Sequence, residues 1–278
     1  MSDAHDQFET IRFEQRNAVG WITLNRPEVL NAFNSVMMRE LSTLYDDLRQ
    51  RPDIRVLVLT GAGDRSFCTG VDRDEAATGP GNLPEDSLID AWPDSPFDYR
   101  DVSEWIGPKT RGLWKPMIAA VNGIACGGAF YFLGEVDFII AADHATFFDP
   151  HVSYGLTAAF EPVLMMQNMP FQEIMRLTLL GNWERMSAQR AHQIGLVSEV
   201  VPMAELEARA MWAAEAIASA PPLPVQATLR SLWSAREMSR SQALSVGYTY
   251  IGLGNQASNV DEGQHDFANG RRIDWRLR

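Results

Sequence analysis

Residues 116–137 read PMIAAVNGIACGGAFYFLGEVD, and the rest of the chain can be placed around this stretch. Residues 117–121 are all apolar and too few for a helix of their own, so they predict a buried strand. Glycines follow at 123 and at 127–128, before an apolar segment that we expect to be helical. A strand that ends at glycines and continues as a helix leaves backbone N–H groups unpaired. Such donors either stabilise an oxyanion or serve a tight turn without chemistry, and the stretch alone favours the plain turn.

Length, charge and cysteine content limit the class of protein. The chain has 278 residues, 46% of them hydrophobic and 22% charged, which is typical of one large soluble domain or a domain with an appendage. A net charge of −12 argues against nucleic acid and anionic membranes as partners, whereas a few local arginines are enough for a small anion. The uncharged run 117–134 contains Asn122 and several glycines, so we expect core rather than a membrane span. Two cysteines and a polar, acidic N-terminus predict a cytoplasmic protein.

The segments around the central stretch alternate between strand and helix patterns. Apolar residues at helical spacing between 37 and 48 follow Asn34 or Ser35, either of which can cap the helix. A buried strand then runs into a loop with a second glycine turn, at Gly70. We expect strands over 8–15, 19–24, 54–60, 138–142 and 145–149, and almost only helices after residue 203. The predicted division is a core over 1–200 and a helical region over 201–278.

Residues 78–108 differ in amino-acid composition from the segments before them. They begin with Thr-Gly-Pro-Gly and continue with many Asp and Pro residues among scattered aromatics. Loops of this length are usually functional or disordered, and the aromatics argue for packing. A lid over a ligand and a surface loop without a function are equally consistent with the pattern.

Three segments, in this order and spacing, resemble the crotonase (enoyl-CoA hydratase/isomerase) superfamily. They are LNRPEVLNA at 24–32, LVLTGAGDRSFCTGVD at 57–72 and KPMIAAVNGIACGG at 115–128, and the likeness extends over about residues 8–272. The resemblance implies an α/β fold, a crotonase-like spiral of ββα units with a helical C-terminal trimerisation region. It also implies a homotrimer or homohexamer that acts on an acyl-CoA thioester. Coenzyme A is then part of the substrate, and no separate cofactor or metal is expected.

The resemblance also assigns binding roles by motif position. The backbone N–H groups of Val71 and Gly128 correspond to the two donors that polarise the thioester carbonyl in this family. Arg73 stands where the family often has lysine, and arginine suits phosphate because its donors are paired. The implied coenzyme A contacts are Arg26, Leu30, Ala32, Ser66, Thr69, Val71, Asp72, Arg73 and Arg271.

Two departures from the family pattern change the expected chemistry. Hydratases of this family use two glutamates, and the corresponding positions here hold Tyr131 and His151. His151 is a candidate general base or acid because its unperturbed pKa lies near neutrality. Asp149 shares a face with it if the segment is extended, and Asp149 or Glu161 can orient it. Tyr131 is a candidate donor of a proton or hydrogen bond to a leaving group or a second oxyanion. The alternatives are a packed histidine, a pocket-wall tyrosine and a helix-end glutamate. Glu135 is expected to be an ordinary surface or helix-end residue.

Three functions remain open from the sequence. The first is an atypical hydration or isomerisation of an acyl-CoA, which belongs to the lyase or isomerase class and uses an oxyanion hole with His151 and Glu161 or Asp149. The second is hydrolytic C–C cleavage of a cyclic β-diketone-type acyl group, which some superfamily members perform with a histidine and an acidic residue in this loop region. The third is an inactive CoA-binding or scaffold homologue, which the absent glutamates favour and the retained glycine turn opposes.

Overall fold

The computed structural model describes residues 8–76, 101–270, 273 and 275–278. The chain forms two compact units, Met1–Ala214 and Glu215–Arg278. The boundary falls within α8 (Met203–Ala218), later than the predicted division after residue 200. The reason is that Leu206, Ala210 and Ala214 of α8 are buried, so the first turns of this helix belong to the core of the first unit.

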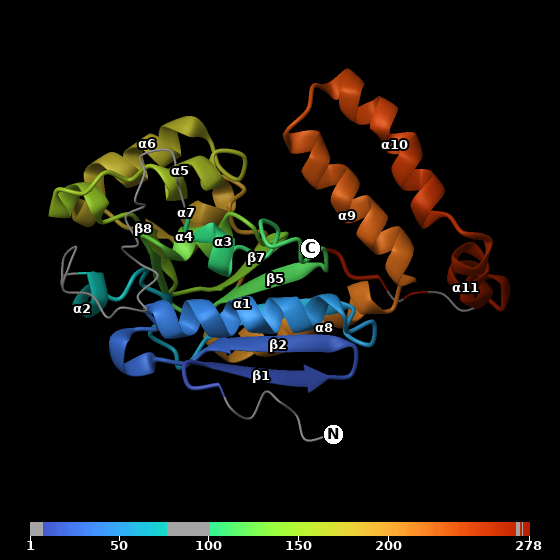
Figure 1. Cartoon of the computed structure of the whole chain (residues 1–278), viewed down its shortest axis with the longest axis horizontal. Coiled ribbons are helices and arrows are strands. Elements are labelled where there is room, and N and C mark those ends of the chain that lie inside the picture. Colours follow the sequence, from blue (N-terminus) through green and yellow to red (C-terminus); the bar gives the residue numbers. More distant parts are fainter. Residues whose placement is uncertain (1–7, 77–100, 271–272, 274) are drawn as a thin grey trace. The chain divides into compact units, whose positions relative to one another are not determined.

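Two sheets form the first unit, and the chain alternates between them (Figure 1). Strands β3, β5 and β7 lie side by side in a six-stranded sheet, and each is followed directly by a short strand of a four-stranded sheet, β4, β6 and β8. Each β-β pair therefore makes one turn of a spiral, as predicted. The six-stranded sheet consists of β1 (Ile11–Arg16), β2 (Val19–Leu24), β3 (Val56–Gly61), β5 (Met117–Val121), β7 (Phe138–Ala142) and β10 (Glu199–Val201), and the four-stranded sheet of β4 (Ser66–Cys68), β6 (Ile124–Cys126), β8 (Thr146–Phe148) and β9 (Met186–Ser187).

One edge strand of each sheet runs against the others, whereas the opposite edge strands, β10 and β4, are parallel to their neighbours. β1 pairs with β2 as an antiparallel hairpin, and β9 is antiparallel to β8, whereas the inner strands are parallel. Parallel inner strands covered on both faces are expected to be uniformly apolar. All five side chains of β5 and all six of β3 are buried accordingly.

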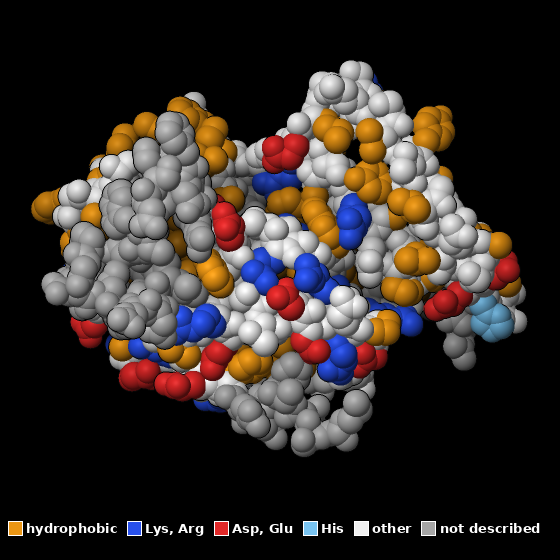
Figure 2. Space-filling view, viewed as in Figure 1, with side chains coloured by type: hydrophobic (Ala, Val, Ile, Leu, Met, Phe, Trp, Pro, Cys, Tyr) orange, Lys and Arg blue, Asp and Glu red, His pale blue; other side chains and the backbone are white. Residues whose placement is uncertain are grey.

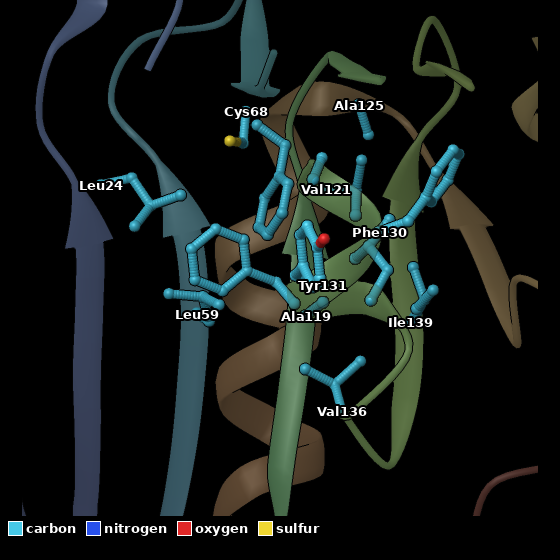
Figure 3. Packing of buried hydrophobic residues seen from close by; sticks show 14 of the residues in the cluster. Leu24, Leu59, Cys68, Ala119, Val121, Ala125, Phe130, Tyr131, Val136 and Ile139 are labelled. Carbon is cyan, nitrogen blue, oxygen red and sulfur yellow. The ribbon is translucent and has the colours of Figure 1, made fainter. Parts of the chain in front are cut away.

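Two helices fix the position of the central stretch. In α1 (Ser35–Arg49) the residues at helical spacing are buried, and the Asn34 side chain accepts the Met37 N–H at 3.0 Å, so Asn34 is the cap. The helix α4 (Ala129–Leu133) follows the central glycine turn and is buried on every side. Figure 3 shows side chains of α4 among those of the surrounding strands. The central stretch thus forms the predicted strand, glycine turn and helix.

Two buried asparagines tie the loops of the spiral together. The Asn122 side-chain N–H groups donate to the carbonyls of Gly61, Gly63 and Ser66 at 2.7–3.0 Å. The Asn31 amide donates to the same Ser66 carbonyl at 2.9 Å and to that of Ala62 at 3.0 Å. Because both amides are buried, these bonds hold the loop between β3 and β4 in one conformation.

The remaining helices surround this core. The first unit also contains the 3₁₀ turns η2 (Pro27–Val29), η3 (His151–Tyr154) and η4 (Gly181–Trp183) and the helices α2 (Arg73–Ala76), α3 (Ser103–Ile106), α5 (Phe160–Met165), α6 (Phe171–Leu180) and α7 (Ala188–Gln193). The second unit holds α9 (Pro222–Arg236), α10 (Arg240–Gly254) and α11 (Ala257–Ala268), and α9 packs against α10. Of the segment 78–108, for which a lid was one prediction, 78–100 lies outside the described residues, and α3 packs against α1 and α4. Among the described helices, each is too short or too polar to cross a bilayer.

Candidate active site

Two glycine turns from successive rounds of the spiral touch each other. Gly70 follows β4 with a φ of 87°, a conformation that side chains other than glycine rarely adopt. A Cβ on Gly70 would lie 2.7 Å from the backbone N of Gly128, which follows β6. A Cβ on Gly128 would lie 2.8 Å from the ring of Phe33. Glycine is therefore required at both positions, and the turns that hold Val71 and Gly128 are neighbours.

The backbone N–H groups of Val71 and Gly128 have no hydrogen-bond acceptor among the residues that the structure describes. Val71 forms a parallel bridge with Phe33, in which the Phe33 N–H donates to Gly70 and the Asp72 N–H donates back to Phe33, both at 2.8 Å. This bridge leaves the Val71 N–H on the side away from Phe33. The helix α4 has only five residues, so its dipole is small. An anion at this turn would therefore be bound by the N–H groups of Val71 and Gly128 themselves.

His151 is held between two buried carboxylates. Its Nδ1 is 2.5 Å from Asp149 Oδ1, which also accepts the backbone N–H of His151 at 3.0 Å. Its Nε2 is 3.4 Å from Glu161 Oε1. The Asp149 side chain is 1% exposed and that of Glu161 is 6% exposed, against 20% for the imidazole. Of the three groups, the imidazole is therefore the one that is open to the outside.

The histidine also lies against the central glycine turn. A Cβ on Gly127 would lie 3.7 Å from His151 Cε1 and 3.5 Å from Pro150 Cδ. The Gly127 N–H donates to the Phe148 carbonyl at 3.2 Å, which ties this turn to the end of β8. The structure thus places an acid–base side chain against the Gly127–Gly128 turn, which in turn contacts the turn at Gly70. That combination is a candidate site for moving a proton near a developing negative charge.

The charges around His151 shift two pKa values upward. The hydrogen bond to Asp149 raises the pKa of His151, against the opposite effect of burial. Burial raises the pKa of Glu161, and the nearby charges of Asp149 and Asp101 add to this, while His151 opposes it. Both shifts favour a proton held within the His151–Glu161 pair.

Most of the predicted coenzyme A contacts lie together. Arg26 bonds to the Asp72 carboxylate at 2.6 Å and to the Ala32 carbonyl at 2.9 Å, and the Thr69 hydroxyl donates to the Leu30 carbonyl at 3.3 Å. These bonds join the loop after β2 to the loop after β4. The Arg73 guanidinium is exposed and lies 5.0 Å from the centre of the Tyr154 ring.

Two of the predicted contacts do not join this cluster. The Ser66 side chain is 1% exposed, and its carbonyl is already bonded to both buried asparagines. Arg271 lies outside the described residues.

Two further positions near α4 have different environments. Tyr131 is 4% exposed and lies in the hydrophobic cluster, where Figure 3 shows it beside Phe130 and Ala119. Glu135, which the sequence indicated as a surface or helix-end residue, follows the end of α4 but is buried. It accepts the backbone N–H groups of Lys109 and Thr110 at 2.7 and 2.9 Å, so it anchors the loop after α3.

The sequence did not single out Asp101 or the two buried asparagines. Asp101 lies near Glu161 although 60 positions separate them in the chain, and no local pattern predicts that approach. A signal for Asn122 existed, because a polar residue between a buried strand and a glycine predicts a loop-fixing amide.

The protein is an α/β spiral with two contacting glycine turns and a histidine, flanked by carboxylates, against one of them. This combination defines the class of protein. Residues 14–278 match the family model described as "Enoyl-CoA hydratase/isomerase". The chain therefore belongs to the enoyl-CoA hydratase/isomerase family, whose members act on acyl-CoA thioesters.

Individual relatives agree with this assignment over their whole length. The chain is 32% identical to the (E)-benzylidenesuccinyl-CoA hydratase of Thauera aromatica, over 94% of this chain and 96% of that one. It is 30% identical to the carnitinyl-CoA dehydratase of Salmonella arizonae, over 96% and 98%. The crystal structure of an enoyl-CoA hydratase/isomerase from Mycobacterium paratuberculosis superposes with a TM-score of 0.84 at 33% identity, covering 98% of this chain and all of that one.

Proposed function

We propose that this chain catalyses the reversible addition of water to an enoyl-CoA, a lyase reaction in which His151 and Glu161 replace the family's pair of glutamates. The observation that carries the proposal is the position of His151. Its imidazole lies against the Gly127 turn and reaches one buried carboxylate with each ring nitrogen. A side chain that only filled space would not require two buried carboxylates as partners.

The Val71 and Gly128 N–H groups bind the thioester oxygen in this proposal. Conjugate attack on an enoyl thioester moves an electron pair onto that oxygen, so donors aimed at it stabilise the enolate more than the substrate. Both N–H groups lack acceptors in the described part of the chain, and both lie on turns that the surrounding packing holds in place. They therefore need little reorganisation when the charge develops.

The proton transfers can be completed within the His151–Glu161 pair. With its Nδ1–H bonded to Asp149, neutral His151 presents the Nε2 lone pair, which takes a proton from water as the water oxygen bonds to Cβ. The C=C electron pair passes through Cα to the thioester oxygen and forms the enolate. Protonated Glu161 then gives its proton to Cα, and the proton on Nε2 crosses the 3.4 Å gap to restore Glu161. One water is consumed, and the pair ends as it began.

The acyl-CoA is held, in this proposal, by the cluster of Arg26, Asp72 and Thr69 and by Arg73. The Arg26–Asp72 ion pair is mostly buried and fixes the loop, whereas Arg73 is exposed and can pair with a phosphate. The names of two relatives, a benzylidenesuccinyl-CoA hydratase and a carnitinyl-CoA dehydratase, favour a branched or aryl-substituted acyl group over a short straight one.

A second function is favoured by the Asp149–His151 contact itself. A histidine oriented by a buried carboxylate is also the arrangement that activates water for attack on a ketone. In that case water adds to a carbonyl of a cyclic β-diketone-type acyl group, the C–C bond breaks, and the departing enolate is held by Val71 and Gly128. The product is a ring-opened carboxylic acid, whereas hydration gives a β-hydroxyacyl-CoA.

We further propose that copies of this chain associate, as a homotrimer or homohexamer. No residue of α9 is buried, and in α10 only Gly254 is. Leu232, Tyr248 and Leu253 are 65%, 81% and 61% exposed, and Figure 2 shows apolar side chains gathered on these helices. A helical hairpin with so little core of its own is not stable in water, so a second copy is needed to cover it. Light scattering of the full chain tests this proposal; a monomer at micromolar concentration would contradict it.

The test of activity follows the loss of enoyl absorbance with crotonyl-CoA and with a phenyl-substituted enoyl-CoA, and identifies the product by mass spectrometry. We expect turnover of at least one enoyl-CoA and a fall of about 10²–10⁴-fold in His151→Gln. His265→Gln, which changes an exposed histidine of α11, is the matched control and should turn over normally. Normal turnover in His151→Gln would remove this residue from the mechanism. CoA binding without turnover of any enoyl or β-diketone thioester would favour the inactive homologue.

A further inference from the structure

The first unit has a hollow on the far side of the short strands from the proposed active site. Its volume is about 640 Å³. It lies where β4, β6 and β8 begin, whereas the glycine turns that hold Val71 and Gly128 follow the ends of β4 and β6. Because these strands are parallel, their starts and ends are at opposite edges of the sheet. The lining residues are Asp64, Arg65, Ile124, His144, Thr146, Arg185 and Met203.

Two arginines in this hollow have no carboxylate partner among the described residues. Arg65 forms no ion pair with any of them, and the only described contact of the Arg185 guanidinium is the Phe148 ring, 4.4 Å away. The neighbouring arginines Arg176 and Arg190 both pair with glutamates. Both side chains are exposed, so in a chain of net charge −12 they give this hollow a local positive charge that is accessible to an anion.

The wall of the hollow also contains a hydroxyl whose oxygen is enclosed by the protein and is not open to a ligand in the hollow. Thr146 Oγ1 is buried and has no hydrogen-bond partner in the described part of the chain, although buried hydroxyls are usually bonded. The neighbouring His144 is already used, since its Nε2 is 2.8 Å from the Asp64 carbonyl. Asp64 is the one acidic residue in the lining, so the two arginines leave the hollow with a formal charge of about +1.

We propose that this hollow binds a phosphorylated small molecule and is separate from the acyl-CoA site. Guanidinium groups form paired hydrogen bonds to phosphate oxygens, and two of them on different loops can each bind a pair of oxygens of one phosphate group. The apolar side chains of Ile124 and Met203 give the remainder of such a ligand a surface to pack on.

The test is a calorimetric titration of the full chain with inorganic pyrophosphate, with ionic strength held constant by chloride. We expect saturable binding that weakens by about tenfold or more in Arg65→Gln/Arg185→Gln. Arg12→Gln/Arg240→Gln changes the net charge equally at exposed positions that are not among the residues lining the hollow, and it should bind pyrophosphate as the natural chain does. Repeating the titration with saturating coenzyme A separates the two sites, because binding in the hollow should persist.

Two outcomes would overturn the proposal. One is the absence of saturable binding to the natural chain. The other is a pair of results: coenzyme A abolishes pyrophosphate binding, and the double substitution leaves it unchanged. These results would assign the pyrophosphate to the acyl-CoA site. Arg185→Gln also loses the contact with Phe148, so the melting temperature is measured for each variant. Arg65→Gln alone, at a position without an ion pair, should still weaken binding if the double variant fails to fold.

Discussion

Gly70 is the position where the geometry of the proposed anion site can be tested most directly. Gly70→Ala forces a side chain onto a backbone with a φ of 87°, which costs about 1–3 kcal/mol of folding free energy. The new Cβ would also lie 2.7 Å from the Gly128 nitrogen and 3.2 Å from the Cys126 carbonyl. Real Cβ atoms do not approach backbone so closely, so one of the two turns has to move. The atom approached is the proposed oxyanion donor itself.

Gly63→Ala provides the matched control. Gly63 has a φ of 80°, so alanine there meets the same backbone strain of about 1–3 kcal/mol, but its Cβ would have no atom within 4 Å. The difference between the two variants therefore isolates the contact with Gly128 from the cost of the φ angle. Loss of one oxyanion donor typically reduces the rate by roughly 10²–10³-fold. We expect a fall in kcat of that size in Gly70→Ala and an unchanged kcat in Gly63→Ala.

The assay pairs enoyl-CoA turnover with the free energy of unfolding from denaturant titration. Both variants should lose stability, and Gly70→Ala should lose more because of the added clash. If Gly70→Ala is folded and turns over as fast as Gly63→Ala, the two turns do not form the anion site, and the mechanism based on Val71 and Gly128 is wrong. If Gly63→Ala also loses turnover, the effect belongs to loop strain and not to the contact.

Three further substitutions test the buried charges. In Asp149→Asn, turnover should fall by about 10²–10³-fold. The alkaline limit of turnover should also move to lower pH, because Asp149 raises the pKa of His151 and the His151–Glu161 pair must hold one proton to react. An unmoved pH profile would contradict this role of Asp149. Because the pKa of His151 is raised in the folded protein, its protonation stabilises the fold fully below the unfolded pKa of about 6.5. This stabilisation is lost as pH rises through the folded pKa. Asp149→Asn should therefore flatten the pH dependence of the unfolding free energy between these two pKa values. Glu161→Gln should remove the return path for the proton and lower turnover without weakening binding of coenzyme A, as measured by calorimetry; weaker binding with normal kcat would place Glu161 in binding instead. Glu135→Ala should cost about 2–4 kcal/mol of stability, because the N–H groups of Lys109 and Thr110 lose a buried acceptor, yet should leave kcat of the folded protein unchanged.

The elements that sequence reasoning located were those with a strong local pattern. The apolar run 117–121 and the glycines after it gave the central strand and turn, and the spacing from Met37 to Leu48 gave the helix and its cap at Asn34. Order and spacing of the motifs gave the family. These features depend on neighbours within a few positions, so the sequence alone contains the information.

Asp149 does contact His151, but not for the reason that the sequence suggested. Alternation along a strand put both residues on one face, but the chain leaves β8 at Phe148, and His151 begins the 3₁₀ turn η3. Asp149 instead receives the His151 backbone N–H, and this turn brings the imidazole onto the carboxylate. Burial was harder still to predict. Ser66 and Glu135 are both polar, and each is enclosed by loops that are distant in sequence.

The asparagine bonds that hold the loop between β3 and β4 have a consequence for how the protein responds to acidity. Neither Asn31 nor Asn122 ionises, and backbone N–H groups do not titrate in the physiological range. The proposed site would thus have a thioester-binding half whose geometry is independent of pH and a proton-handling half, around His151, that depends on pH. Over the range in which kcat changes, KM for the thioester should therefore stay nearly constant, so the protein would keep its substrate bound while acid or alkali switches the chemistry off.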